Sequence, residues 1–183
     1  MMPQVDPMLG WTAAGAGAAI FAASGALKFY DLEAFRGAVT NYRLIPEWLA
    51  TPFAWATPVL ECAAALGLLL GPLRAAAALV LIVLLGVFTG AIAINLVRGR
   101  TDIDCGCFGP ALRQRLSWRL LLRNGALLAL LAIALMPAGP RPMDFLDVAS
   151  ATMAAATVVV LYTAANYLIA NAPGLRALGA LNA

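Results

Sequence analysis

The stretch AAAALVLIVLLGVFTGAIAINLV, residues 75–97, decides the fold because none of its side chains is charged. A helix that crosses a bilayer needs about 20 consecutive apolar residues, so this stretch predicts one membrane span. The whole chain has the same character: 63% of its 183 residues are hydrophobic, only 11% are charged, and the mean hydropathy is +0.87. Soluble domains have about 25% charged residues. The sequence therefore predicts an integral membrane protein.

Apolar runs on both sides of this stretch predict the rest of the bundle. With 75–97, we expect five spans, at about 9–27, 53–70, 75–97, 116–136 and 145–170. Between the first two, Leu32, Phe35 and Val39 recur at helical spacing, which predicts a short interfacial helix that ends before Pro46. The fold class is all-α: a polytopic membrane helix bundle with a four-helix core, a fifth transmembrane helix and a short interfacial helix. We expect residues 1–183 to form a single integral membrane domain.

Small residues predict where these helices approach one another closely. Alanine recurs every four residues in the first span, and glycines four apart occur in the third, and such stripes are typical of closely packed membrane helices. The stripes are Ala14, Ala18, Ala22 and Ala26 in the first span and Gly86 and Gly90 in the third.

Positive charge is distributed unevenly between the two sides of the membrane. Nine lysines and arginines fall on the side that holds the loop after residue 97, against Arg74 and Arg141 on the other side. By the positive-inside rule, this count predicts that the loop faces the cytoplasm. No basic face with interleaved aromatics is present, so nucleic acid is not an expected partner. The four-residue spacing of Arg115, Arg119 and Arg123 instead predicts a stripe that contacts membrane lipid headgroups, or else an acidic partner.

The residues available for chemistry are few. The chain has no histidine, which excludes serine–histidine and cysteine–histidine catalysis, and two thiolates fall short of the four ligands of a structural zinc site, so no metal is expected. The loop TDIDCGCFGP, residues 101–110, holds Cys105 and Cys107. A disulfide across one residue closes a small, strained ring that is easy to reduce, which favours thiol exchange. Two inert thiols, or a bond that only shapes the loop, are the alternative.

Glu61 is the second candidate, because an ionisable group inside a span is costly and by default suggests function. It could relay a proton, hold a hydroxyl or carbonyl of a bound ligand, or pair with an arginine. The alternative is a structural hydrogen bond or a salt bridge to Lys28 near the end of the first span. The neighbouring Cys62 is alone at membrane depth, where an isolated cysteine usually packs as a small apolar residue.

Four segments in order resemble the methylamine utilisation protein E (MauE) family, which is grouped with the DoxX-like membrane proteins. The resemblance implies a role, with a periplasmic thioredoxin-like (MauD-like) partner, in maturing the disulfide-rich small subunit of methylamine dehydrogenase. The layout is also similar to vitamin K epoxide reductase, which implies a thiol pair that passes electrons to a quinone held among the helices. The segments are SGALKFYDLEAF (24–35), YRLIP (42–46), PVLECAAALGLLLG (58–71) and NLVRGRTDIDCGCFG (95–109).

The chain departs from vitamin K epoxide reductases, whose active cysteines are separated by two residues and are served by a second loop pair. Residues 28–52 contain no cysteine, so a shuttle pair would come from the partner protein. The family role implies a periplasmic loop, against the charge count, and we adopt the periplasmic placement.

We therefore expect a thiol:disulfide oxidoreductase component of a redox maturation system in the bacterial inner membrane. Cys105 and Cys107 would be its catalytic residues, and Glu61 would bind the quinone cofactor. The alternatives are a non-catalytic scaffold for the thioredoxin-like partner, and a soft-metal or small-solute permease that uses the thiols as entry ligands.

Overall fold

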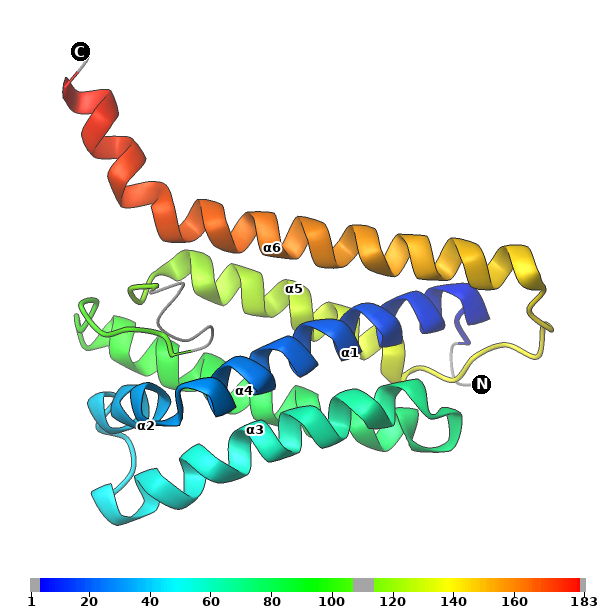
Figure 1. The fold of residues 1–183 in the computed structure, drawn as a ribbon, viewed down its shortest axis with the longest axis horizontal. Helices are drawn as coiled ribbons and strands as arrows, with labels where there is room; N and C mark the ends of the chain where they lie inside the picture. The colour runs from blue at the N-terminus through cyan, green and yellow to red at the C-terminus, as the bar shows by residue number, and fades with distance from the viewer. Residues whose placement is uncertain (1–3, 107–113, 182–183) are drawn as a thin grey trace.

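The computed structural model describes residues 4–106 and 114–181, with side chains as far as residue 171. The described chain is helical, and five of its helices are long and apolar enough to cross a membrane, so the protein is a multi-pass membrane protein of the predicted all-α class. In chain order the elements are α1 (Pro7–Tyr30), α2 (Leu32–Asn41), α3 (Glu47–Leu69), the 3-10 turn η1 (Gly71–Leu73), α4 (Arg74–Val97), α5 (Trp118–Leu135) and α6 (Phe145–Leu181) (Figure 1).

Helix α1 is the centre of the bundle and packs against α3, α5 and α6, while α4 packs against α3 and α5. Helix α6 lies along the outside, as Figure 1 shows. Of its most apolar window only 6% of the residues are buried, compared with 56% in α1. The predicted all-α class with five transmembrane helices is confirmed, and the structure adds that the fifth lies at the periphery. Helix α6 continues to Leu181, beyond the predicted end at residue 170.

The short helix α2 follows α1 directly and ends before Pro46, as predicted. Asp31 starts it, because its Oδ1 accepts a hydrogen bond of 3.0 Å from the backbone N–H of Ala34. Phe35 and Val39 are buried in one cluster with Phe88 of α4. Helix α2 therefore covers the bundle with its apolar face. Together with residues 98–106 and 114–117 and the start of α5 it forms what we call the loop end of the molecule (Figure 1).

Close packing between α1 and α3 involves Gly25 and only the first half of the predicted alanine stripe. A Cβ placed on Gly25 would lie 2.6 Å from the Cys62 Sγ, so no larger residue fits there. Ala14 and Ala18 are buried, but Ala22 and Ala26 are exposed, so the predicted stripe is wrong in its second half. Four residues advance about 400° around a helix, and such a stripe turns about 40° away from its neighbour at every step.

The other departures concern the third span and two helix starts. Gly86 and Gly90 are exposed, and a Cβ on either would have no heavy atom within 4 Å. The prediction that they allow close contact with another helix is therefore wrong. Helix α3 begins right after Pro46, six residues before the predicted start. Helix α5 begins at Trp118, two residues after the predicted start of the fourth span at 116.

Candidate functional site

Cys105 lies at the loop end and is only 2% exposed. Its backbone N–H donates a 2.8 Å hydrogen bond to the carbonyl of Gln114, and its carbonyl accepts one of 3.1 Å from the Tyr42 hydroxyl. Its side chain belongs to a buried cluster that joins α4, α5 and the end of α2. The first predicted catalytic cysteine is therefore held from both sides and recessed, while Cys107 lies outside the described residues.

Gly106 seats the loop on α2. Its φ of +72° lies in the left-handed region that glycine adopts without steric cost. A Cβ at this position would lie 2.8 Å from the Cβ of Ala38 and 3.5 Å from the Phe35 ring. The Asp104 carboxylate accepts from the Gln114 N–H at 3.2 Å, which closes the base of the loop. The glycine between the two cysteines is thus required by its backbone angle and by the space that α2 leaves.

Glu61 pairs with Lys28 in the interior of the bundle. The Lys28 Nζ donates to both carboxylate oxygens at 2.7 Å and to the Ser24 hydroxyl at 2.6 Å. The two side chains are 3% and 4% exposed. The salt bridge considered as the structural alternative for Glu61 is therefore present. Since Lys28 is buried against this carboxylate, it is not one of the surface cations assumed in the count of positive charges.

Two aromatic rings enclose the Lys28 ammonium. Its Nζ lies 5.4 Å from the ring centre of Phe35 and 5.8 Å from that of Phe88, within the range of cation–π attraction. Phe35 also touches the position of Gly106. The buried ion pair and the cysteine loop are therefore neighbours across a single aromatic side chain.

A second buried polar cluster surrounds Arg123, which is 8% exposed. Its guanidinium donates to Gln114 Oε1 at 3.0 Å, Asn166 Oδ1 at 2.8 Å and Asn124 Oδ1 at 2.9 Å. Asn124 in turn donates to the Thr89 hydroxyl at 3.0 Å. The cluster links α4, α5 and α6 to Gln114, whose backbone carbonyl accepts the hydrogen bond from the Cys105 N–H.

The predicted stripe of three arginines on one helix face is wrong, because the three side chains lie in different surroundings. Arg115 precedes α5 and pairs with Asp102 at 3.2 Å, Arg119 is exposed, and Arg123 points into the bundle. The sequence reasoning also missed Asn124 and Asn166. The sequence feature that could have identified them is the one that identified Glu61: each is a strongly polar side chain inside an apolar run.

Two spaces adjoin these clusters. An internal cavity of about 30 Å³ lies between the Lys28–Glu61 pair and Arg123, and a groove of about 560 Å³ lies between α5 and α6. Arg123 and Tyr162 border both spaces. The cavity has the volume of about one water molecule, so it holds no quinone ring as it stands. That Glu61 binds a quinone stays a prediction, and one that requires the helices to separate.

Cys62 is half-buried in α3 next to Glu61, with its sulfur against the position of Gly25. This contact fits the packing role expected from the sequence, because the small sulfur lets α1 and α3 approach closely.

Comparison with known proteins agrees with the resemblance in the sequence. The family model described as "Methylamine utilisation protein MauE" matches residues 6–137. The chain is 41% identical to methylamine utilization protein MauE of Paracoccus denitrificans, over 90% of this chain and 89% of that protein. It is 44% identical to the protein of the same name from Methylorubrum extorquens, over 86% and 85%. No solved structure matches. On this match and these identities, the chain belongs to the MauE family.

Proposed function

We propose that this protein is the membrane thiol:disulfide oxidoreductase component of a methylamine utilisation system. It would act in the bacterial inner membrane with a periplasmic thioredoxin-like (MauD-like) partner, and the client would be the disulfide-rich small subunit of methylamine dehydrogenase. The names of the relatives support the assignment to a methylamine utilisation system. The observation that carries the redox role is the seating of Cys105, held by its backbone against Gln114 and Tyr42 beside the conformationally demanding Gly106.

The exchange step follows from thiol chemistry. A thiolate of the partner attacks one sulfur of the Cys105–Cys107 disulfide, and the second partner thiolate then breaks the mixed disulfide. The partner leaves with a new disulfide, and the pair is left as two thiols. Because Cys105 is 2% exposed, we assign the attacked sulfur to Cys107 and the leaving thiolate to Cys105.

The thiol pair must then lose two electrons and two protons, and a membrane quinone supplies that oxidising capacity when it is bound. The groove between α5 and α6 suits a quinone by volume and lining: it is apolar, and the Arg123 guanidinium and Tyr162 lie in its wall. Ile169 lines this groove and also packs against the cluster that contains Cys105. Arg123 would donate to a carbonyl oxygen of the quinone in this groove. Arg123 and Tyr162 separate the groove from the small cavity that the Lys28–Glu61 pair lines, and from that cavity the pair would exchange protons with the quinone.

The test is trapping of the mixed disulfide with the thioredoxin-like partner. In Cys105→Ser the Cys107 thiolate can still attack the disulfide of the oxidised partner, and the mixed disulfide should accumulate because Cys105, the thiol that would break it and release the reduced partner, is missing. Cys107→Ser should accumulate none, because its remaining thiol is buried. Cys62→Ser is the matched control and should behave as the wild type. If the variant with both loop cysteines replaced still supports oxidation of the partner, the protein is a scaffold and the proposal fails.

A further inference from the structure

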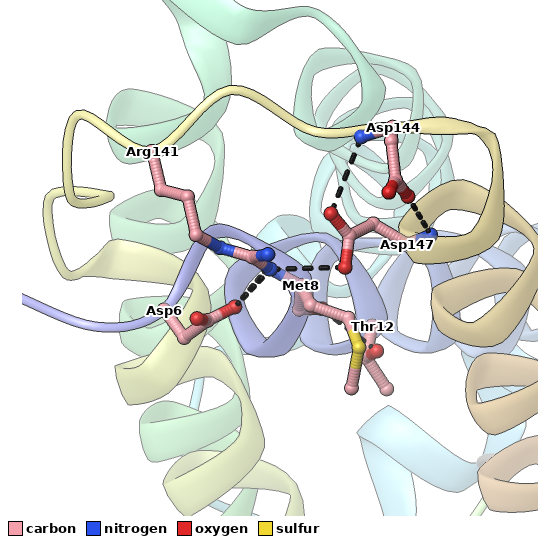
Figure 2. Close-up of polar contacts among 6 residues, drawn as sticks. All are labelled: Asp6, Met8, Thr12, Arg141, Asp144 and Asp147. Carbon is pink, nitrogen blue, oxygen red and sulfur yellow. Dashed lines mark hydrogen bonds and ion pairs between the residues drawn. The ribbon is translucent and has the colours of Figure 1, made fainter.

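Two arginines lie at the end of the bundle opposite the loop end, and their surroundings differ. Arg141 pairs with Asp147 at 3.0 Å and with Asp6 at 3.4 Å, so it joins the starts of α1 and α6 (Figure 2). The hydrogen bond to Asp147 and the charges of both carboxylates raise the pKa of the Arg141 guanidinium. Asp6 also accepts from the backbone N–H of Met8 at 2.8 Å. The positive charge of Arg141 is thus neutralised within the chain.

Arg74 has no such neutralisation. Within the described parts of the chain, no carboxylate oxygen lies within 4.0 Å of its guanidinium. The guanidinium lies 5.6 Å from the ring centre of Trp11 and about 3.4 Å from where a Cβ on Gly10 would be. Tryptophan is enriched where the membrane meets water. Among the described residues Arg74 is therefore a cation without a carboxylate partner, and it is held beside Trp11 at the end of the bundle opposite the loop end.

A large apolar groove starts beside this pair. It has a volume of about 870 Å³ and lies between α1 and α6, with Trp11 and Leu69 in its lining. Small residues floor it, among them Gly15, Ala19 and Ala156. On α6 the lining extends from Val148 to Val160, which corresponds to about 18 Å of helix. One leaflet of the hydrocarbon core is about 15 Å thick, so the groove is as long as an acyl chain of that leaflet.

We infer that this groove binds an anionic phospholipid, with the phosphate on Arg74 and an acyl chain along the groove. The planar guanidinium donates two parallel hydrogen bonds to phosphate oxygens, and Trp11 fixes its orientation. A transmembrane helix of another protein would fill the length of the groove but would leave the charge of Arg74 unmatched. The combination of a surface cation with an apolar groove one leaflet long fits a lipid.

The inference is tested by native mass spectrometry of the full chain in detergent, titrated with phosphatidylglycerol or with zwitterionic phosphatidylcholine. The wild type should retain one phosphatidylglycerol with about tenfold preference over phosphatidylcholine. Arg74→Gln should lose that preference and Arg74→Lys should keep part of it. Ala156→Trp, which fills the groove from an exposed position, should lower the affinity for both lipids at least tenfold.

Two matched variants control for charge and bulk. Arg98→Gln removes an exposed arginine at the loop end, and Met153→Trp adds bulk to a position of α6 that is 73% exposed and outside the groove. Both should bind lipid as the wild type does. The inference is overturned if Arg74→Gln keeps the full preference while melting at the wild-type temperature. It is equally overturned if Ala156→Trp leaves lipid affinity unchanged, or blocks association with another protein while lipid still binds.

Discussion

The ion pair between Lys28 and Glu61 gives the sharpest energetic prediction. Glu61→Leu removes the carboxylate that accepts from the Lys28 Nζ at 2.7 Å, in a place where the lysine side chain is only 3% exposed. Removing one partner of a buried pair costs about 3–5 kcal/mol, because the remaining charge stays desolvated. We expect Glu61→Leu to lower the free energy of unfolding by about 3 kcal/mol.

Removing both charges together should cost far less. Replacement of a complete buried pair by apolar residues of similar volume is often neutral or stabilising. Lys28→Met combined with Glu61→Leu should therefore unfold within about 1 kcal/mol of the wild type, and the double-mutant cycle should give a coupling energy of about 3 kcal/mol or more. Glu61→Gln keeps the shape of the side chain but should resemble Glu61→Leu, because the amide carries no charge to match the ammonium.

The assay is reversible unfolding in mixed micelles, followed by circular dichroism and extrapolated to zero denaturant. The exposed pair Glu33–Arg36, with side chains 79% and 46% exposed, supplies the control. Glu33→Gln should change the free energy of unfolding by less than about 1 kcal/mol, as is usual for surface ion pairs. The reasoning is refuted if Glu61→Leu costs less than 1 kcal/mol, or if the double variant is destabilised by the sum of the single changes.

Three other predictions concern the loop end. In intact cells, a membrane-impermeant maleimide should label the CGC loop only after mild reduction, because the periplasm keeps thiols oxidised. Cys62 should stay unlabelled in both states. Labelling only after permeabilisation, without prior reduction, would place the loop in the cytoplasm as the count of positive charges predicts. Gly106→Ala should speed labelling of Cys105, because an alanine Cβ would lie 2.8 Å from that of Ala38. Gly99→Ala is its control: φ there is also positive, at +71°, but a Cβ would meet nothing within 4 Å, so equal effects of the two variants would remove the role of the α2 contact. Arg123→Gln should weaken binding of a quinone analogue such as decylubiquinone about tenfold, measured as quenching of tryptophan fluorescence. Arg98→Gln, which removes an exposed arginine that does not line the groove, should bind the analogue as the wild type does, and equal affinities of the two variants would exclude Arg123 from the quinone site.

The sequence alone determined which segments cross the membrane. In lipid each backbone polar group must find its partner inside the segment, so a long uncharged run such as 75–97 forms a helix whatever surrounds it. The same local logic located the short amphipathic helix around Phe35, and the spacing of Cys105 and Cys107 with the glycine between them singled out the loop. These features depend on residues that are close in the chain.

Only the tertiary structure decided which side chains meet. Glu61 is paired with a lysine 33 residues away, and Arg123 with Asn166, 43 residues away. Such pairs depend on how far each helix is rotated about its axis and which neighbour faces it. Hydrophobicity leaves that rotation undetermined, because Ala14 and Ala22 are the same residue, yet one is buried and the other exposed. The rotation is set by close packing, through contacts such as that of Gly25 with Cys62, together with the need of each buried charge for a partner.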